Sequence, residues 1–344
     1  MSKLDTCGIE VSAKELVVAL RREETLEPLR SFANTAEGHQ ALIRYLRRAG
    51  GVVRVCLEST GLYGLDLALA LSAQEGLEVR VANPRAVRHF ATALMKRSKN
   101  DQIDAGVLEQ FAARLPFQPW QRPSPVALAL HALARRLSEL VEMQTAEKNR
   151  QHAAELSQAI PAAIRRDLAR SLRAQERAIA RLTREARKVI AQEPKLAERF
   201  ALLDSVPGIA ETSAVQILAE LAVLAPDLEA RQWVAYAGLD PREHSSGSSV
   251  QKKTRLSKAG NKHLRRALYL PALVAVQHDP HLRAFYQHLL ERGKRKMQAL
   301  VAVMRKLLHA FHALFKTRQP FDGSKLFRLE APPVQEVASA SLAS

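Results

Sequence analysis

The hydrophobic pattern of this chain changes its period at a proline-rich stretch, FQPWQRPSP, that begins at residue 117. Before it, short β-branched segments with alternating polarity are separated by helical segments, which is typical of a mixed α/β domain. After it, apolar residues recur every three or four positions, as they do in long amphipathic helices. The change predicts an α/β domain followed by an all-α part, with a linker between them.

The N-terminal third predicts three strands followed by two helix–strand pairs and two further helices. The expected strands are residues 7–12, 15–22, 29–34, 52–59 and 77–83. The expected helices are residues 35–48, 66–74, 85–95 and 101–115. Parallel strands need crossover connections, whereas consecutive antiparallel strands need only turns. A three-stranded meander followed by helical crossovers is the connectivity of an RNase H-like nuclease core, so we expect residues 1–118 to form one domain of that fold.

The remainder of the chain predicts long helices. Two series with heptad spacing, at 126–140 and 168–189, indicate a helical hairpin or a coiled coil within residues 119–195, although a plain helical bundle has the same spacing. A mostly helical domain is expected from 196 to 325. The chain ends in EAPPVQEVASASLAS, which is rich in Pro, Ala and Ser. We expect residues 326–344 to be a disordered tail.

Charge and composition indicate which partners this chain can have. The 344 residues carry a formal net charge of +17, which favours a polyanionic partner, with nucleic acid the first candidate. The longest apolar run, at 267–276, is too short to span a bilayer, so no membrane partner is expected. The N-terminus has no apolar signal core, and two cysteines make no disulfide framework. These features favour a cytoplasmic protein.

Four acidic residues occupy positions from which their carboxylates could converge. Glu10 lies inside the first predicted strand, Glu58 ends the strand 52–59, and Asp101 and Asp104 begin a helix in KNDQIDA. The i, i+3 spacing places the last two on one helix face. Carboxylates from separate elements can hold two Mg²⁺ ions. Asp101 could instead stabilise the helix N-terminus, and Glu58 could be a solvated strand end. Glutamate is depleted in strands, so Glu10 favours the metal site.

A basic segment in the C-terminal part follows a cluster of serines. Between Arg242 and Arg266 there are eight Lys or Arg residues and one acid, a balance that suits contact with phosphates. The predicted contacts are Arg242, Lys252, Lys253, Arg255, Lys258, Lys262 and Arg265. Upstream, LDSVPGIAETSA resembles a helix-hairpin-helix turn, in which Gly208 permits the bend and the next helix N-terminus faces a phosphate.

The serine cluster itself, SSGSSVQKKTR at 245–255, has two interpretations. Runs of Ser and Gly are usually loops. A serine hydroxyl beside arginines and Mg²⁺ can also attack phosphorus, because the developing charge is stabilised there. Residue chemistry does not choose among Ser245, Ser246, Ser248 and Ser249.

Several segments resemble a family of insertion-sequence transposases that includes the Piv-type DNA invertases and the bridge-RNA-guided recombinases. GIEVSAKEL, CLESTG and KNDQIDA are similar to the family's three acidic motifs. SVPGIAETSA, VAYAGLDPRE, SGSSVQKKTRLSKAGNKHLRRALY and MRKLL follow in the family's order, so the resemblance covers nearly the whole chain. It implies a RuvC-like domain with an Asp-Glu-Asp-Asp set and a C-terminal transposase domain whose nucleophile aligns with Ser246. The family's first acid is Asp, whereas this chain has Glu10, whose carboxylate lies one methylene further out.

The resemblance implies a site-specific recombinase that cuts and rejoins DNA through a covalent serine–DNA phosphoester. Mg²⁺ would be held by Glu10, Glu58, Asp101 and Asp104. It further implies a structured guide RNA that pairs with donor and target DNA, and a homo-oligomer, dimer or tetramer. Two alternatives remain open: a Holliday-junction-resolvase-like nuclease that uses the four acids and water, and a non-catalytic nucleic-acid-binding protein with a decayed metal site.

Overall fold

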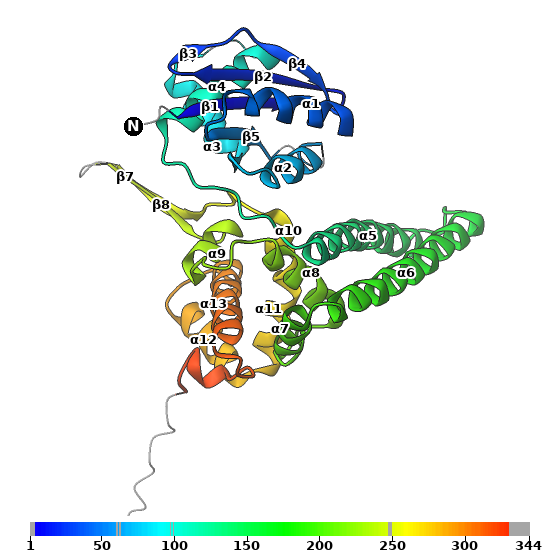
Figure 1. Cartoon of the computed structure of the whole chain (residues 1–344). Helices are drawn as coiled ribbons and strands as arrows, with labels where there is room; N and C mark the ends of the chain where they lie inside the picture. Colours follow the sequence, from blue (N-terminus) through cyan, green and yellow to red (C-terminus); the bar gives the residue numbers. More distant parts are fainter. Residues whose placement is uncertain are drawn as a thin grey trace, which may run out of the picture. The chain divides into compact units, whose positions relative to one another are not determined.

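The computed structural model describes residues 4–59, 61, 63–96, 98, 100–246 and 250–329, without the side chains of residues 49, 243–246 and 250–254. The chain forms two compact units, Met1–Arg122 and Pro123–Ser344. The first is mixed α/β and the second is mostly helical, as expected (Figure 1), and the RNase H-like assignment of the first unit stays a prediction. In the predicted linker, the Trp120 amide donates a hydrogen bond of 2.6 Å to the Val79 carbonyl, so this residue belongs to the first unit.

A mixed sheet is the centre of the first unit. Its order is β3-β2-β1-β5-β6, with β4 also paired to β2. Strand β2 runs antiparallel to β1, whereas β1, β5 and β6 are parallel to one another. The strands are β1 (Asp5–Val11), β2 (Glu15–Arg22), β3 (Thr25–Leu26), β4 (Arg30–Ala33), β5 (Val53–Glu58) and β6 (Leu77–Ala82). The predicted strands are confirmed to within a few residues. Strand β3 was missed because two exposed residues carry no alternation.

Alternation along β1 explains how both faces of the sheet are covered. Cys7, Ile9 and Val11 are buried in one core with residues of α1 (Ala36–Leu46) and α2 (Leu65–Ser72). The other face carries Thr6, Gly8 and Glu10 and packs against α4 (Asp101–Arg114), with α3 (Pro84–Ala93) beside it. The short 3₁₀ turn Arg47–Ala49 follows α1.

Helices α3 and α4 begin at asparagine caps. The Asn83 side chain accepts a hydrogen bond from the Arg85 amide, and Pro84 suits the first helical position. The Asn100 side chain accepts a hydrogen bond of 2.7 Å from the Ile103 amide. These caps determine the residue at which each helix starts, and therefore which side chains of the first turn can reach the sheet.

Helix α4 is held very close to the sheet. A Cβ added at Gly8 would lie only 2.1 Å from the Ala105 carbonyl oxygen. Next along the helix, Glu109 is 1% exposed. Its Oε1 accepts hydrogen bonds from Thr6 Oγ1 at 2.6 Å and from Arg21 Nε at 2.8 Å. Gly8 of β1, which has no side chain, and the ion pair from buried Glu109 to Arg21 of β2 together determine the position of α4.

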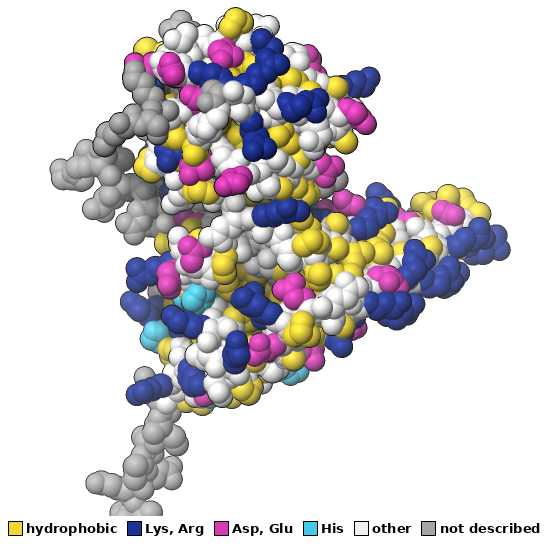
Figure 2. All heavy atoms as spheres, viewed as in Figure 1, with side chains coloured by type: hydrophobic (Ala, Val, Ile, Leu, Met, Phe, Trp, Pro, Cys, Tyr) yellow, Lys and Arg dark blue, Asp and Glu magenta, His cyan; other side chains and the backbone are white. Residues whose placement is uncertain are grey.

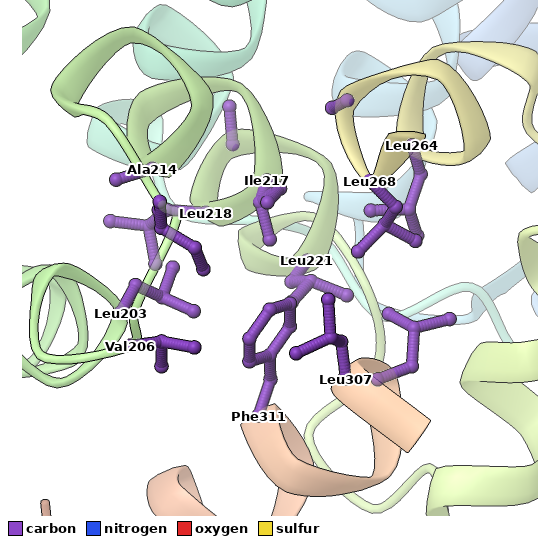
Figure 3. Packing of buried hydrophobic residues seen from close by; sticks show 14 of the residues in the cluster. Leu203, Val206, Ala214, Ile217, Leu218, Leu221, Leu264, Leu268, Leu307 and Phe311 are labelled. Atoms are coloured by element: carbon purple, nitrogen blue, oxygen red, sulfur yellow. The ribbon is translucent and has the colours of Figure 1, made fainter. Parts of the chain in front are cut away.

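The second unit begins with α5 (Pro125–Glu155) and α6 (Ala162–Ala191), which lie side by side as a long helical hairpin (Figure 1). The hairpin is one of the predicted forms, and the coiled coil stays a prediction. The hairpin shares a core with the helices that follow, and Figure 3 shows Phe311 and Leu307 facing Leu221 in that core. Those elements are α7 (Pro194–Asp204), α8 (Glu211–Ala222), α9 (Ala230–Tyr236), β7 (Pro241–Ser246), β8 (Val250–Leu256), α10 (Lys262–Ala267), α11 (Tyr269–His278), α12 (Pro280–Glu291), α13 (Lys296–Thr317) and a 3₁₀ turn, Gly323–Lys325.

The structure bears on the predicted absence of a membrane span and on the predicted disordered tail at 326–344. Among the helices described, none combines the length and the apolar character that crossing a bilayer requires. At the start of the predicted tail, the Leu326 carbonyl accepts a hydrogen bond from Lys306 and the Phe327 ring lies 5.6 Å from Phe285. Residues 330–344 lie outside the described residues.

Gly8→Ala is expected to destabilise the first unit by about 3 kcal/mol, because the new methyl group would overlap the α4 backbone. Urea denaturation can be followed by Trp120 fluorescence in a Trp233→Phe background, since these are the two tryptophans of the chain. The matched control is Gly106→Ala, whose Cβ would meet nothing within 4 Å. That change should leave stability equal or raise it by up to about 1 kcal/mol. Equal midpoints for the two variants would contradict the packing described here.

Candidate functional site

A cleft of about 1110 Å³ lies on the α4 side of the sheet and is lined by three of the four predicted acids. Glu10 comes from β1, Glu58 from the end of β5 and Asp104 from the first turn of α4. Ile9 pairs with Leu57, so the next residue of each strand leaves the same face of the sheet at the same edge. All three acids are half-buried. The convergence expected from the sequence is therefore observed for these three residues.

Asp101 is placed differently from the other acids. It is the first residue of α4, directly after the capping Asn100, and its side chain is exposed. Among the described residues that line the cleft, Asp104 is present and Asp101 is not. Its position suits an acid at the positive end of a helix. The i, i+3 spacing predicts that Asp101 and Asp104 share one helix face, but only Asp104 lines the cleft.

Cationic residues that the sequence analysis missed line the same cleft. Arg85 and Arg88 project from α3, and Lys96 follows that helix; all three are exposed. The signal was present in the sequence, because Arg85, Arg88 and Thr92 follow the i, i+3, i+7 spacing of one helix face. A cleft lined by both acids and cations could hold a phosphodiester together with a metal ion, because the cations would attract the phosphate.

The donor chemistry of the cleft fits a hard divalent cation. Glu10, Glu58 and Asp104 offer carboxylate oxygens, which are the ligands that Mg²⁺ prefers. Within the part of the chain that is described, no three Asp, Glu, His or Cys side chains form a closed metal-binding group. A bound ion would have to draw the carboxylates together. Asp5, the other acid on β1, is held by Arg22, whose Nη1 lies 3.0 Å from Asp5 Oδ2.

The serine cluster lies on the β7–β8 hairpin of the second unit. Ser246 is the last residue of β7 and its backbone pairs with Val250. Gly247, Ser248 and Ser249 lie outside the described residues, as do the side chains of Ser245, Ser246, Lys252 and Lys253. The predicted nucleophile can therefore be placed by its backbone alone, at the distal end of the hairpin.

Two of the predicted phosphate contacts face each other across the hairpin. Arg242 pairs with Arg255 in the strand register, and both are exposed. Like charges opposite each other on neighbouring strands destabilise a hairpin. A phosphate bound between the two arginines would remove this repulsion, so the pairing favours an anionic ligand.

The base of the hairpin is fixed by a buried carboxylate that the sequence analysis did not single out. Glu220 of α8 is 2% exposed. Its Oε1 lies 2.7 Å from Arg135 Nε, and its Oε2 accepts a hydrogen bond of 2.5 Å from Asn261 Nδ2. The same Asn261 amide group donates to the Tyr236 hydroxyl at 2.7 Å. One acid inside the apolar run QILAELAVL was the sequence signal for this buried charge.

The segments that flank the hairpin are locked together by close backbone approach. A Cβ at Gly260 would lie 2.3 Å from the Tyr236 carbonyl oxygen, and a Cβ at Gly238 would lie 2.8 Å from Arg265 Nη1. The Lys258 amide donates a hydrogen bond of 3.0 Å to the Gly238 carbonyl. The hairpin therefore emerges from a rigid base.

The remaining predicted contacts have different surroundings. Lys258 and Lys262 are exposed, whereas Arg265 donates a hydrogen bond of 2.7 Å to the Ala237 carbonyl and is partly structural. Gly208 lies in the turn between α7 and α8 with φ +90°, and a Cβ there would come 2.8 Å from the Ala275 amide nitrogen. The glycine is thus required by packing on α11 as well as by the bend.

Comparison with known proteins identifies similarity over both units. A family described as Transposase, of the DEDD type found in IS110, matches residues 7–161, and a family described as Transposase IS116/IS110/IS902 matches residues 200–287. Pilin gene-inverting proteins of Moraxella bovis and Moraxella lacunata are each 28% identical over 297 residues, covering 85% of this chain and 90% of theirs. An uncharacterized 42 kDa protein of insertion element IS900 from Mycobacterium paratuberculosis is 23% identical over 321 residues, covering 74% of this chain and 80% of its own.

Glu220→Gln is expected to lower the free energy of unfolding at pH 7 by about 1–3 kcal/mol, because Arg135 loses its charged partner. Burial raises the pKa of Glu220, but the nearby His131 ring, the charge of Arg135 and the hydrogen bond from Asn261 outweigh it, so the pKa is lowered from its ordinary 4.5. A lowered folded pKa gives stability that is present above 4.5 and is lost as pH falls through the folded value.

The difference between Glu220→Gln and the parent should therefore shrink as pH falls below 4.5, which urea denaturation across a pH series measures. The control is Glu139→Gln. Glu139 forms an exposed ion pair with Arg136, 2.8 Å apart, whose loss should cost less than about 1 kcal/mol at any pH. A pH-independent difference for Glu220→Gln would show that the carboxylate charge is not what anchors the hairpin base.

Proposed function

We propose that this chain, which matches two IS110-type transposase families over residues 7–161 and 200–287, cuts and rejoins DNA through a covalent ester between Ser246 and a DNA phosphate. The observation that carries the proposal is the convergence of Glu10, Glu58 and Asp104 on one cleft that Arg85, Arg88 and Lys96 also line. This is the arrangement that phosphodiester chemistry needs, because carboxylates hold metal ions and cations neutralise the phosphate.

The first unit acts as an RNase H- or RuvC-like domain. The order of its sheet supports this assignment, since the antiparallel β2 and the parallel β5 and β6 lie on opposite sides of β1. The acids at the carboxyl ends of β1 and β5 and at the start of α4 then come together on one face.

Transposases of the DEDD type depend on divalent metal ions, typically Mg²⁺. In this chain Glu10, Glu58 and Asp104 would hold the ion, whereas Asp101, at the start of α4, lies outside the cleft and would contribute less. When bound, such an ion stabilises the negative charge that develops on the phosphate oxygens. Arg85 and Arg88 orient the DNA strand in the cleft by contacting its backbone.

The reaction is a transesterification in two balanced steps. The Ser246 hydroxyl loses its proton, its oxygen forms a bond to phosphorus, and the bond from phosphorus to the adjoining DNA oxygen breaks. That oxygen takes up a proton, and the strand remains joined to the protein as a phosphoester. In the second step a DNA hydroxyl attacks the same phosphorus and releases the serine. Arg242 and Arg255 stabilise the charged phosphate oxygens in both steps.

A structured guide RNA directs the cut to its donor and target DNA, and the chain works as a homo-oligomer, a dimer or tetramer. The exposed arginines of α6 support a large polyanionic partner, and Figure 2 shows dark blue side chains along the outer side of the helical hairpin. They are Arg165, Arg166, Arg170, Arg173, Arg177, Arg181, Arg184 and Arg187. A surface of this length neutralises several phosphates at once.

A second candidate function is a metal-dependent nuclease that uses water and forms no covalent intermediate. The DEDD match and the cleft favour it, because the acids and the cationic residues of the cleft belong to one unit. In that case Ser246 would contribute to binding and not to bond cleavage.

Asp104→Asn is expected to reduce Mg²⁺-dependent DNA cleavage by more than about 100-fold while DNA binding persists, because it removes a charged ligand at unchanged size. Asp101→Asn should reduce cleavage by less than about 10-fold, since Asp101 stands outside the cleft. Asp66→Asn, an exposed acid at the start of α2, is the control and should cleave like the parent. Cleavage of end-labelled DNA over a Mg²⁺ series measures all three. Equal losses at positions 101 and 104 would contradict the placement of the acids.

Ser246→Ala is expected to abolish a covalent protein–DNA adduct, because no other group at that position can form the ester. A nicked suicide substrate, from which the cut strand diffuses away, should trap the adduct as a denaturation-resistant, protease-sensitive band. Ser246→Cys should retain a trace, since a thiolate is nucleophilic. Ser245→Ala is the matched control and should form the adduct normally. Cleavage at an undiminished rate by Ser246→Ala, with free DNA ends and no adduct, would establish the water-using nuclease instead.

A further inference from the structure

A separate cavity of about 510 Å³ lies at the base of the β7–β8 hairpin, in the second unit. Its floor is apolar and comes from Leu239, Val301 and Met304, of which Leu239 and Met304 are buried. Its rim is cationic and comes from Lys258, Lys262, Arg265 and Arg266. A volume of this size falls in the range of about 300–1,000 Å³ that accommodates small ligands.

Two exposed apolar side chains border the opening. Tyr269, the first residue of α11, is 38% exposed, and Met297, near the start of α13, is 54% exposed. An aromatic ring beside an apolar floor is the platform on which a nucleobase stacks. Contact with phosphates alone would require neither the aromatic ring nor the apolar floor, because exposed cations suffice to bind the backbone of a duplex.

The charges at the rim are arranged to accept an anion. Arg265 is held against the Ala237 carbonyl and forms a rigid part of the wall. Among the described residues of the lining, the one carboxylate is Glu142, and it is already paired with Arg266. Lys258 and Lys262 are exposed and lie on the solvent side of the cavity. An anion at the rim is therefore attracted by the lysines and is not repelled by an unneutralised acid.

We propose that this cavity binds a single unpaired nucleotide, with the base against Tyr269 and Met297 and the phosphate at Lys258 and Lys262. A nucleotide combines a flat apolar ring with an anionic group, which matches an apolar floor below a cationic rim. Taking a base out of a duplex costs a few kcal/mol, and this cost is least where the base is already unpaired. The ligand is thus a bulged or displaced nucleotide, not an intact base pair.

The bound nucleotide is not the one that reacts at Ser246. Leu256 lines the cavity and pairs with Pro241, while Ser246 pairs with Val250 at the other end of the hairpin. The six residue steps of β8 between these ends span about 20 Å. At about 3.4 Å per base pair, a strand that followed the hairpin would place the unpaired nucleotide roughly six positions from the cut. The inference rests on the proposed action on nucleic acid, but it needs no covalent step.

The test compares two fluorescein-labelled DNA hairpins that are identical except for one bulged thymine. The protein should bind the bulged hairpin about 10-fold more tightly than the fully paired one, because one stacked base contributes about 1–3 kcal/mol. The Tyr269→Ala variant should lose the preference for the bulged DNA hairpin, while its affinity for the fully paired DNA hairpin stays within about twofold of the parent. Tyr269→Phe keeps the ring and should retain the preference, which separates stacking from a general effect on folding.

Two further variants complete the design. Lys258→Ala with Lys262→Ala should weaken binding of both hairpins and flatten the salt dependence by about two units of slope, because phosphate contacts do not distinguish the probes. Tyr63→Ala removes an exposed aromatic ring of the first unit and is the matched control; it should keep the preference. Equal binding of the two hairpins by the parent, a preference that survives in Tyr269→Ala, or no binding of either hairpin would each overturn the inference. Because the assay has no cleavage step, the absence of a serine adduct would leave its result intact.

Discussion

The close approach of α4 to β1 at Gly8 determines where the acidic cleft can form. A helix can lie this near a central strand only where the strand has no side chain, and the buried Glu109–Arg21 pair holds it there. The residue before the point of contact is Asp104, so the same approach places its carboxylate in the cleft that Glu10 also lines. The metal site proposed for the first unit depends on this contact, because a bound ion could draw the carboxylates together only if they already line one cleft.

Each unit positions its site with a buried carboxylate. Glu109 joins α4 to the sheet, and Glu220 joins α8 to α5 and to the segment after the hairpin. A buried ion pair adds little net stability, because desolvation offsets most of the attraction between the charges. Removing one partner is nevertheless costly, since the other charge is left buried. Such pairs therefore favour one arrangement of the elements over the alternatives, which is what a site built from several elements requires.

The positive charge of the chain serves different surfaces. Arg85 and Arg88 line the same cleft as the carboxylates, whereas the arginines of α6 form an exposed cationic surface on the helical hairpin. At the base of the β7–β8 hairpin, Lys258 and Lys262 line an apolar cavity. Binding to the phosphate backbone of a duplex would not require such a cavity. A net charge of +17 attracts any polyanion. Whether a cationic surface is flat, a cleft or a cavity determines whether it binds the backbone or a base of a nucleic acid.

By itself the sequence determined most of the strand and helix order of the first unit, the acidic residues and the basic segment, because hydrophobic period and residue type are local properties of the chain. It did not predict that the basic segment forms the β7–β8 hairpin. Its motifs, in a constant order, also resemble those of one transposase family. Only the tertiary structure decided that Asp101 stands outside the cleft while Arg88 lines it, and that Gly208 is required by packing on α11. The anchoring role of Glu220 was likewise decided by folding. These facts depend on contacts between residues far apart in the chain, and local pattern carries no information about which distant backbone will lie against a given side chain.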